Sequence, residues 1–126
     1  MLFTRELQRR LAGDAATKNI AVNCFSPGLI TSGNFFRYQN PVFTKVFDFV
    51  ATKVAKVAET NEWGGASLEY MTTVDTKGQF YTSPPGSSKY GNDAFGREFK
   101  VYQVSKEAQD DAKAKKLWDL SEKLVA

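Results

Sequence analysis

Ile20-Ala-Val-Asn-Cys-Phe-Ser-Pro-Gly-Leu-Ile-Thr-Ser32 is the stretch that decides the fold of this chain. It opens as a short apolar run, stops at Pro27-Gly28 and continues into a small polar loop. An Ile/Val/Phe-rich run bounded by turn residues is typical of a parallel strand that is buried on both faces. In open α/β sheets, ligands bind beyond the carboxyl ends of such strands. The pattern therefore predicts a strand over residues 20–25 and a ligand site at the Pro-Gly loop.

Length and composition exclude several classes of protein. At 126 residues and 42% hydrophobic content, the chain has the apolar mass of one globular domain. Its net charge of +3 is spread among acidic residues, so no nucleic-acid partner is predicted. With one cysteine, Cys24, and no histidine, it offers no internal disulfide, zinc site or Ser-His-Asp triad. No apolar run reaches the ~18 residues of a membrane span, which predicts a soluble or peripheral protein.

Two helices flank the strand in the predicted element order. Phe3, Leu7 and Leu11 recur at helical spacing, and Gly13 ends that first helix. Thr60 is the expected N-cap of a helix that runs to about residue 71. The Gly64-Gly65 pair inside this second helix suggests close approach to another backbone, since glycine costs about 1 kcal/mol there relative to alanine.

The second half of the chain is predicted to add one strand, a loop and a final helix. Residues 78–82 are expected to form a last strand parallel and adjacent to residues 20–25, because a right-handed crossover joins them. A long loop over residues 83–99 follows. Ser105 is the expected N-cap of a closing helix over about residues 106–125.

The segment from residue 34 to residue 57 is rich in Phe and Val. Apolar side chains at positions 43, 46, 47, 50, 54 and 57 follow helical spacing, and the charged residues fall mostly off this stripe. The pattern predicts an amphipathic helix or a pair of helices. The stripe has two interpretations: it packs on the protein's own core, or it forms the apolar wall of a ligand site. Both can hold for different residues of the segment.

Two motifs of dinucleotide chemistry are weak or missing. No Gly-x-Gly-x-x-Gly turn follows an N-terminal strand, so we expect the chain alone to bind a dinucleotide poorly. Tyr102-Gln-Val-Ser-Lys106 matches the spacing of a tyrosine whose pKa is lowered by a lysine, but it lies after the Pro-Gly strand and no serine-bearing strand leads into it. No catalytic residue is predicted in this chain.

The order of helix, strand and Pro-Gly-Leu-Ile-Thr-Ser resembles the last third of a short-chain dehydrogenase/reductase. The tail Lys116-Leu-Trp-Asp-Leu-Ser-Glu-Lys-Leu-Val125, with Asn34-Phe-Phe-Arg37, resembles the light-dependent NADPH:protochlorophyllide oxidoreductases of that superfamily. The resemblance implies an α/β fold, the C-terminal part of a doubly wound (Rossmann-type) parallel sheet with two strands, a helical lid and a long C-terminal helix. Residues 1–126 would form one portion of a domain, with the lid at about residues 31–58, and Met1 would be internal to a longer protein or the start of a truncated gene product.

The same resemblance implies an NADPH-dependent reduction of a ring double bond of protochlorophyllide in light, as in chlorophyll biosynthesis, with the proton donor outside this chain. It assigns the nicotinamide to a loop and the pigment to the lid. The cofactor-binding residues would be Pro27, Gly28, Leu29, Ile30, Thr31 and Ser32, and the pigment would contact Phe35, Phe36, Phe43 and Phe47. A plastid location, and peripheral association of the whole protein with plastid membranes, are implied in the same way.

Leu29 departs from the family pattern, which typically places a cysteine directly after Pro-Gly. Leucine cannot donate a proton, so a dark reductase of another bulky apolar substrate is an alternative. The isolated chain has a further alternative, a non-catalytic fragment or binding module. Because a sheet of two strands exposes an edge, we also expect the isolated chain to self-associate.

Overall fold

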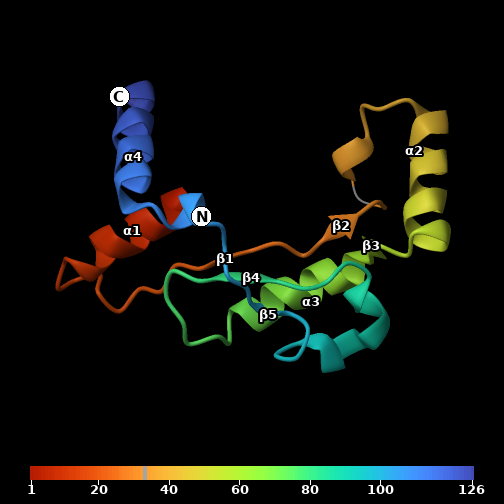
Figure 1. Ribbon diagram of the computed structural model, residues 1–126, viewed down its shortest axis with the longest axis horizontal. Coiled ribbons are helices and arrows are strands. Elements are labelled where there is room, and N and C mark those ends of the chain that lie inside the picture. Colours follow the sequence, from red (N-terminus) through yellow and green to blue (C-terminus); the bar gives the residue numbers. More distant parts are fainter. Residues whose placement is uncertain (33) are drawn as a thin grey trace. The chain divides into compact units, whose positions relative to one another are not determined.

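The computed structural model describes residues 1–32 and 34–126, without the side chain of Phe35. The chain forms two compact units. The first comprises Met1–Phe25, Asp75–Tyr81 and Val101–Ala126, and the second comprises Ser26–Val74 and Thr82–Lys100. Helices and short strands occur in both units (Figure 1), which confirms the predicted mixed α/β composition.

A three-stranded sheet with the strand order β1-β4-β5 carries the predicted parallel pair. β1 (Cys24–Phe25) runs parallel to β4 (Phe80–Thr82), with Cys24 opposite Phe80. β5 (Lys100–Val101) pairs with the other edge of β4. The predicted adjacency and direction of the two strands are therefore confirmed.

β1 is shorter than the strand that the sequence predicts over residues 20–25. The side chain of Gln8, on helix α1 (Leu2–Ala12), accepts the Val22 N–H at 2.6 Å and donates to the Ile20 carbonyl at 3.3 Å. These backbone groups thus bond to a helix side chain where a strand would bond to its neighbour. The regular strand begins only at residue 24.

Helices α1 and α4 (Asp111–Val125) pack against each other in the first unit. The Phe3 ring stacks on Trp118 with centroids 4.8 Å apart, and the Arg10 guanidinium lies over the same indole at 4.7 Å. Aromatic stacking and cation–π contact each contribute about 0.5–1.5 kcal/mol beyond area burial. α1 ends at Gly13, as predicted.

The final helix begins five residues later than the sequence predicts. Asp110 caps α4 by accepting the Lys113 N–H at 3.0 Å. Ser105 accepts the Ala108 N–H at 3.3 Å and so caps only the short 3-10 helix η4 (Glu107–Gln109). The extended backbone of Asp110 separates the two helices, which corrects the predicted helix over residues 106–125 and its predicted cap.

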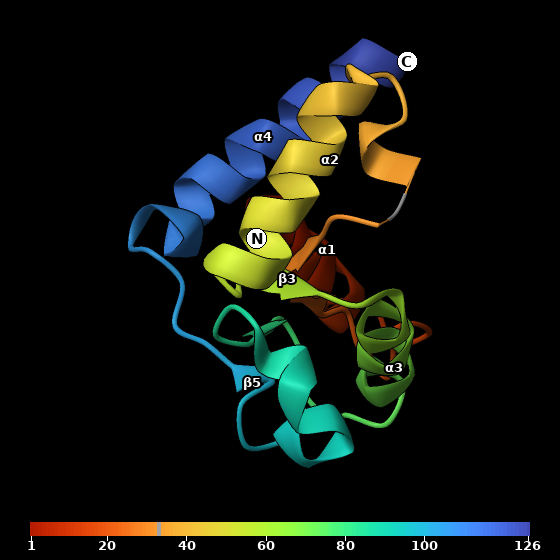
Figure 2. The same cartoon turned by 90° about the vertical axis from the view of Figure 1, so that its right-hand side faces the viewer.

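Helix α3 (Asn61–Met71) is drawn in green in Figure 2, and the segment that follows β4 is drawn in teal. Aromatic side chains from these two segments form the core of the second unit. The Trp63 ring stacks on Phe95 at 4.8 Å, and Phe99, fully buried, meets Trp63 edge-on at 6.0 Å. Thr60 accepts the Trp63 N–H at 3.1 Å, which confirms it as the N-cap of α3. The predicted loop over residues 83–99 is therefore packed, and it contains the kinked 3-10 helix η3 (Ser87–Ala94).

The second unit also contains a strand pair that the sequence does not predict. β2 (Leu29–Ile30) runs parallel to β3 (Ala58–Glu59), with Leu29 opposite Ala58. The described residues thus form five short strands in two sheets, and the expectation of two strands is wrong. Strands of two residues leave almost no alternation pattern for sequence reasoning to detect.

The segment between β2 and β3 is helical, as predicted. A 3-10 turn, η1 (Asn34–Phe36), precedes helix α2 (Pro41–Phe49) and the π-helical turn η2 (Val50–Val54). Asn40 caps α2 by accepting the Val42 N–H at 2.8 Å, and Pro41 occupies the first helical position, where its missing N–H costs nothing. η2 contains the backbone hydrogen bond of a π-helix, from the Ala55 N–H to the Val50 carbonyl at 2.8 Å.

A buried carboxylate on α1 depends on two arginines. Glu6 is only 1% exposed and accepts hydrogen bonds from Arg9 at 2.8 and 2.6 Å and from Arg10 at 2.8 Å. The Arg9 hydrogen bonds are the largest influence and, with those of Arg10, lower the pKa of Glu6 from 4.5 to about 2, against the opposing effect of burial. The ion pairs of Glu6 with Arg9 and Arg10 therefore stabilise the folded chain only while Glu6 is ionised.

Acid should remove this contribution. Because the folded pKa lies below the ordinary value, the stabilisation is fully present above about pH 4.5 and is lost as the pH falls toward about 2. We expect Glu6→Gln to lower the melting temperature at pH 6, and this difference from the parent chain to shrink steadily between pH 4.5 and pH 2. Thermal unfolding followed by circular dichroism measures it. A difference that stays constant over this range would contradict the assignment.

Candidate functional site

A tryptophan from the core of the second unit forms a hydrogen bond to the Pro-Gly loop. The indole Nε1–H of Trp63 donates to the Pro27 carbonyl at 3.0 Å, and Trp63 itself is buried. The Thr60 cap and the stacked Phe95 ring keep this indole in place. The turn at Pro27 is thus attached to the hydrophobic core of the second unit.

Position 28 requires glycine for two reasons, its backbone conformation and the nearby Glu59 side chain. Its φ of +89° lies in the region that side chains rarely adopt. A Cβ built on Gly28 would lie 2.7 Å from Cγ of Glu59. The glycine therefore lets the loop close onto the Glu59 side chain.

Glu59 is a buried acid whose two oxygens both accept backbone hydrogen bonds. Oε1 accepts the Ser87 N–H at 2.9 Å and Oε2 accepts the Ser88 N–H at 2.8 Å, and the residue is 3% exposed. These two N–H groups open helix η3, where they have no partner within the helix. Glu59 thus connects β3, the Pro-Gly loop and the start of η3.

The predicted cofactor residues that follow Gly28 have different surroundings. Leu29 and Ile30 form β2, and the end of the Ile30 side chain fills the space beside Gly64, where a Cβ would lie 2.6 Å from Cδ1. The close approach predicted for the Gly64-Gly65 pair therefore involves a side chain and not a backbone. Gly65 faces open space.

Thr31 and Ser32 face a polar depression of about 330 Å³. The Thr31 hydroxyl makes a short hydrogen bond to Asp48 of α2, and Thr52 of η2 donates to the same carboxylate oxygen at 3.3 Å. These contacts connect the loop to α2 and η2. The depression is also lined by Glu59 and by residues 60–62 at the start of α3.

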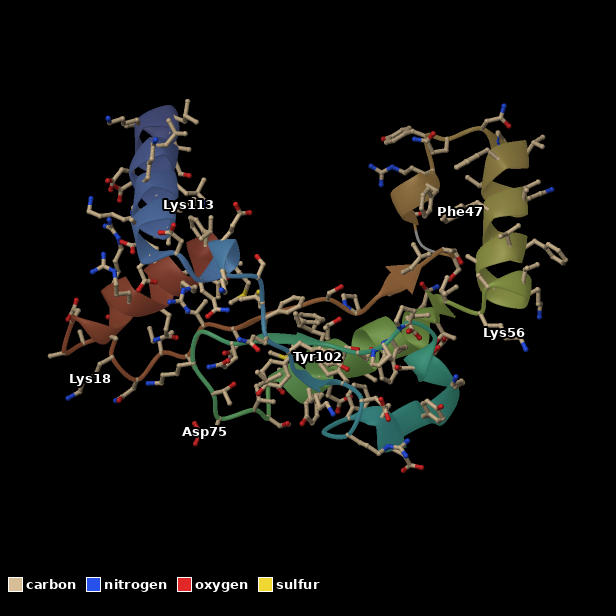
Figure 3. All side chains as sticks on the ribbon, viewed as in Figure 1. Lys18, Phe47, Lys56, Asp75, Tyr102 and Lys113 are labelled. Atoms are coloured by element: carbon tan, nitrogen blue, oxygen red, sulfur yellow. The ribbon has the colours of Figure 1, made fainter. Side chains whose placement is uncertain are left out.

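Three of the four predicted pigment-contacting residues form one cluster. Phe47 lies 5.3 Å from Phe36 and 5.7 Å from Phe43, measured between ring centroids. Figure 3 shows Phe47 projecting from α2 toward the turn that precedes it. The fourth residue, Phe35, has a side chain outside the described part of the structure.

Most of the apolar stripe on α2 and η2 is exposed. Phe43, Val46, Val50 and Val54 expose 45–66% of their surface, whereas Phe47 is half-buried. Among the described residues, only Phe47 and the half-buried Val57 of this stripe are partly covered. Exposed apolar patches often mark binding surfaces.

Sequence reasoning missed the acids and donors that hold the site together. Glu59 precedes a helix cap and carries no motif, and its partners Ser87 and Ser88 lie 28 and 29 residues away. Trp63 likewise belongs to no motif, and its hydrogen-bond partner Pro27 lies 36 residues away. Among the described residues, no helix is long and apolar enough to cross a membrane, and no group of His, Cys, Asp and Glu side chains could hold a metal ion.

Two glycines allow a matched test of the loop. Gly28→Ala should destabilise the chain by at least about 1–2 kcal/mol, because alanine resists the positive φ and its Cβ would clash with Glu59. Gly65→Ala should stabilise it by about 0.5–1 kcal/mol, because that position is helical and open. Urea unfolding of both variants measures the difference. Equal stabilities would show that Gly28 is not under this constraint.

The chain matches no known protein-family model. Over 99% of its length it is 29% identical to protochlorophyllide reductase B, chloroplastic, of Oryza sativa subsp. japonica, and it covers 29% of that protein. It is also 29% identical to a protochlorophyllide reductase of Avena sativa, of which it covers 37%. Retinol dehydrogenase 14 of Homo sapiens is 29% identical over 99% of the chain, which covers 32% of that protein.

The chain spans about a third of the length of these relatives. All of them are oxidoreductases of the short-chain dehydrogenase/reductase type. The resemblance read from the sequence is therefore confirmed: nearly the whole chain is similar to one third of the protochlorophyllide reductases, and equally to one third of a retinol dehydrogenase.

Proposed function

We propose that this chain is the C-terminal portion of an NADPH-dependent oxidoreductase with a doubly wound sheet, which reduces protochlorophyllide to chlorophyllide in light. The observation that carries the proposal is the Pro-Gly loop, held rigidly by Trp63 and Glu59 and placed beside an exposed aromatic helix. The parallel pairing of β1 with β4 and the protochlorophyllide reductases among the relatives support it.

In this proposal, residues 27–32 form the nicotinamide side of the cofactor site. Gly28 brings the backbone close to the ring, main-chain groups near Ile30 bond the carboxamide, and the hydroxyls of Thr31 or Ser32 support it. A carboxamide offers one donor and one acceptor group, which a tight loop can match. NADPH supplies the hydride when it is bound.

The lid of the proposed enzyme is the segment over about residues 31–58. Its exposed Phe43 and the half-buried Phe36 and Phe47 provide an apolar wall of the kind that a large flat pigment requires. The hydrogen bonds from Thr31 and Thr52 to Asp48 join this wall to the cofactor loop. Closure over the substrate would thus be coupled to the nicotinamide position.

A second candidate is a dark reductase of another bulky apolar substrate. The retinol dehydrogenase among the relatives has the same 29% identity as the plant reductases. Leu29 provides no proton, and the lid wall is apolar without being specific to one ring system. A retinoid-like carbonyl compound is the substrate class that this candidate predicts.

The proposal includes a plastid location and peripheral membrane association of the whole protein, by analogy with the chloroplastic relatives. It also includes inactivity of the isolated chain, because the phosphate-binding turn and the Tyr-x-x-x-Lys motif would come from the preceding part of the domain. Self-association of the isolated chain remains a prediction that gel filtration can test.

The deciding experiment uses the full-length protein that contains this chain, expressed after its flanking coding sequence is recovered. The protein is flashed with protochlorophyllide and NADPH while absorbance is recorded. We expect a red shift to chlorophyllide that requires both light and NADPH. NADPH oxidation in the dark with retinal, and no pigment conversion, would favour the second candidate.

The proposed lid leads to a further prediction, which concerns the affinity of the protein for the pigment. Phe43→Ala in the full-length protein should weaken pigment binding about tenfold, because 51% of the side chain is exposed and free to contact a ligand. Leu120→Ala, which removes a similarly exposed apolar side chain from α4, is the matched control and should change nothing. Quenching of pigment fluorescence measures both. Equal losses in the two variants would exclude a specific role for the lid.

A further inference from the structure

The burial of Glu59 exceeds what a helix cap requires. Helix starts are usually capped by a Ser, Thr, Asp or Asn at the N-cap, but the N-cap of η3 is Gly86, which has no side chain. The two N–H groups are instead satisfied by a carboxylate 28 and 29 residues away in sequence. No lysine or arginine in the described part of the chain forms an ion pair with Glu59, so the backbone donors alone compensate its charge.

The Glu59 side chain also packs directly against the Pro-Gly loop. Its Cγ occupies the space that a Cβ on Gly28 would need, so the loop backbone rests directly on the Glu59 stem. Glu59 also belongs to β3, which pairs with β2 immediately after Gly28. Two constraints on the loop therefore involve the same residue, Glu59.

The segment on the far side of Glu59 is equally restrained. Gly86 has a φ of +77°, and a Cβ there would collide with the Lys56 carbonyl. This turn cannot shift to follow a displaced carboxylate without breaking its contact with the backbone that leads into β3. Glu59 thus lies between two restrained backbone segments, this turn and the Pro-Gly loop.

We propose that Glu59 is a positioning residue for the cofactor: it clamps the Pro-Gly loop to the turn at Gly86–Ser88 and so sets where the nicotinamide lies. The inference rests on the proposed function of residues 27–32 as the nicotinamide loop. Glu59 touches neither cofactor nor substrate in this role. It acts through Gly28 and through the β2–β3 pair.

The test is steady-state kinetics of the full-length protein with Glu59→Gln. An amide nitrogen cannot accept a backbone N–H, so one of the two hydrogen bonds is lost and the clamp loosens. We expect the KM for NADPH to rise about tenfold, because part of the binding energy is then used to order the loosened loop. Pigment affinity should stay unchanged.

Two further variants separate positioning from stability. Glu6→Gln also removes a buried carboxylate, but it lies in the first unit, so it should lower the melting temperature without raising the KM for NADPH. Glu59→Asp keeps the charge on a shorter stem and should give an intermediate KM. It also serves as the deciding variant if Glu59→Gln does not fold, since partial unfolding lowers the amount of active enzyme and not its KM.

The outcomes distinguish the inference from the function on which it rests. A parent protein that neither binds nor oxidises NADPH overturns the proposed function, and the positioning role with it. A parent that uses NADPH, with folded Glu59 variants whose KM stays within twofold of its value, overturns the positioning role alone. A raised KM in the Glu59 variants but not in Glu6→Gln supports it.

Discussion

The second unit is organised around one buried charge, the carboxylate of Glu59. A charge this deep is tolerated only where hydrogen bonds replace its lost hydration, and the Ser87 and Ser88 N–H groups do so at 2.9 and 2.8 Å. The requirement fixes the course of the chain on both sides, because η3 must begin at these donors and the Pro-Gly loop must leave room for the stem. The Trp63 indole then completes the support by bonding the Pro27 carbonyl.

The helical segment of α2 and η2 presents an apolar face. Phe47 packs on its neighbours, whereas Phe43, Val46, Val50 and Val54 leave this face in contact with water. Exposure of such a face is unfavourable by about 25 cal/mol per Å² of apolar surface, so covering it would be favourable. A π-helical turn continues α2 at this place, and such turns occur frequently at functional sites. Both features suit a surface built for a ligand.

The features that could be predicted from the sequence are local. Thr60 and Gly13 are recognisable because a cap and a helix end depend on one or two adjacent residues, and the parallel strands are recognisable by their apolar runs. The features that escaped prediction are long-range. Gln8 takes backbone groups from the strand over residues 20–25, and Glu59 reaches η3 across 28 residues. A polar side chain gives no sign of which distant backbone it will satisfy, so the candidate loop was predicted but its supports were not.

The loop is supported through its backbone. This bears on how relatives named for different substrates can both be similar to this chain. The Pro27 carbonyl accepts a hydrogen bond from Trp63, and Gly28 packs against the Glu59 stem because it has no Cβ. Leu29 pairs with Ala58 between β2 and β3. None of these constraints involves the identity of the side chain at position 29. In the proposed enzyme, leucine in place of the cysteine typical of the photoenzymes would therefore change the side chain at the start of β2 without moving the loop. The proposed function then assigns the cofactor geometry to the loop backbone and leaves the side chain at position 29 free to differ between a pigment reductase and a retinol dehydrogenase.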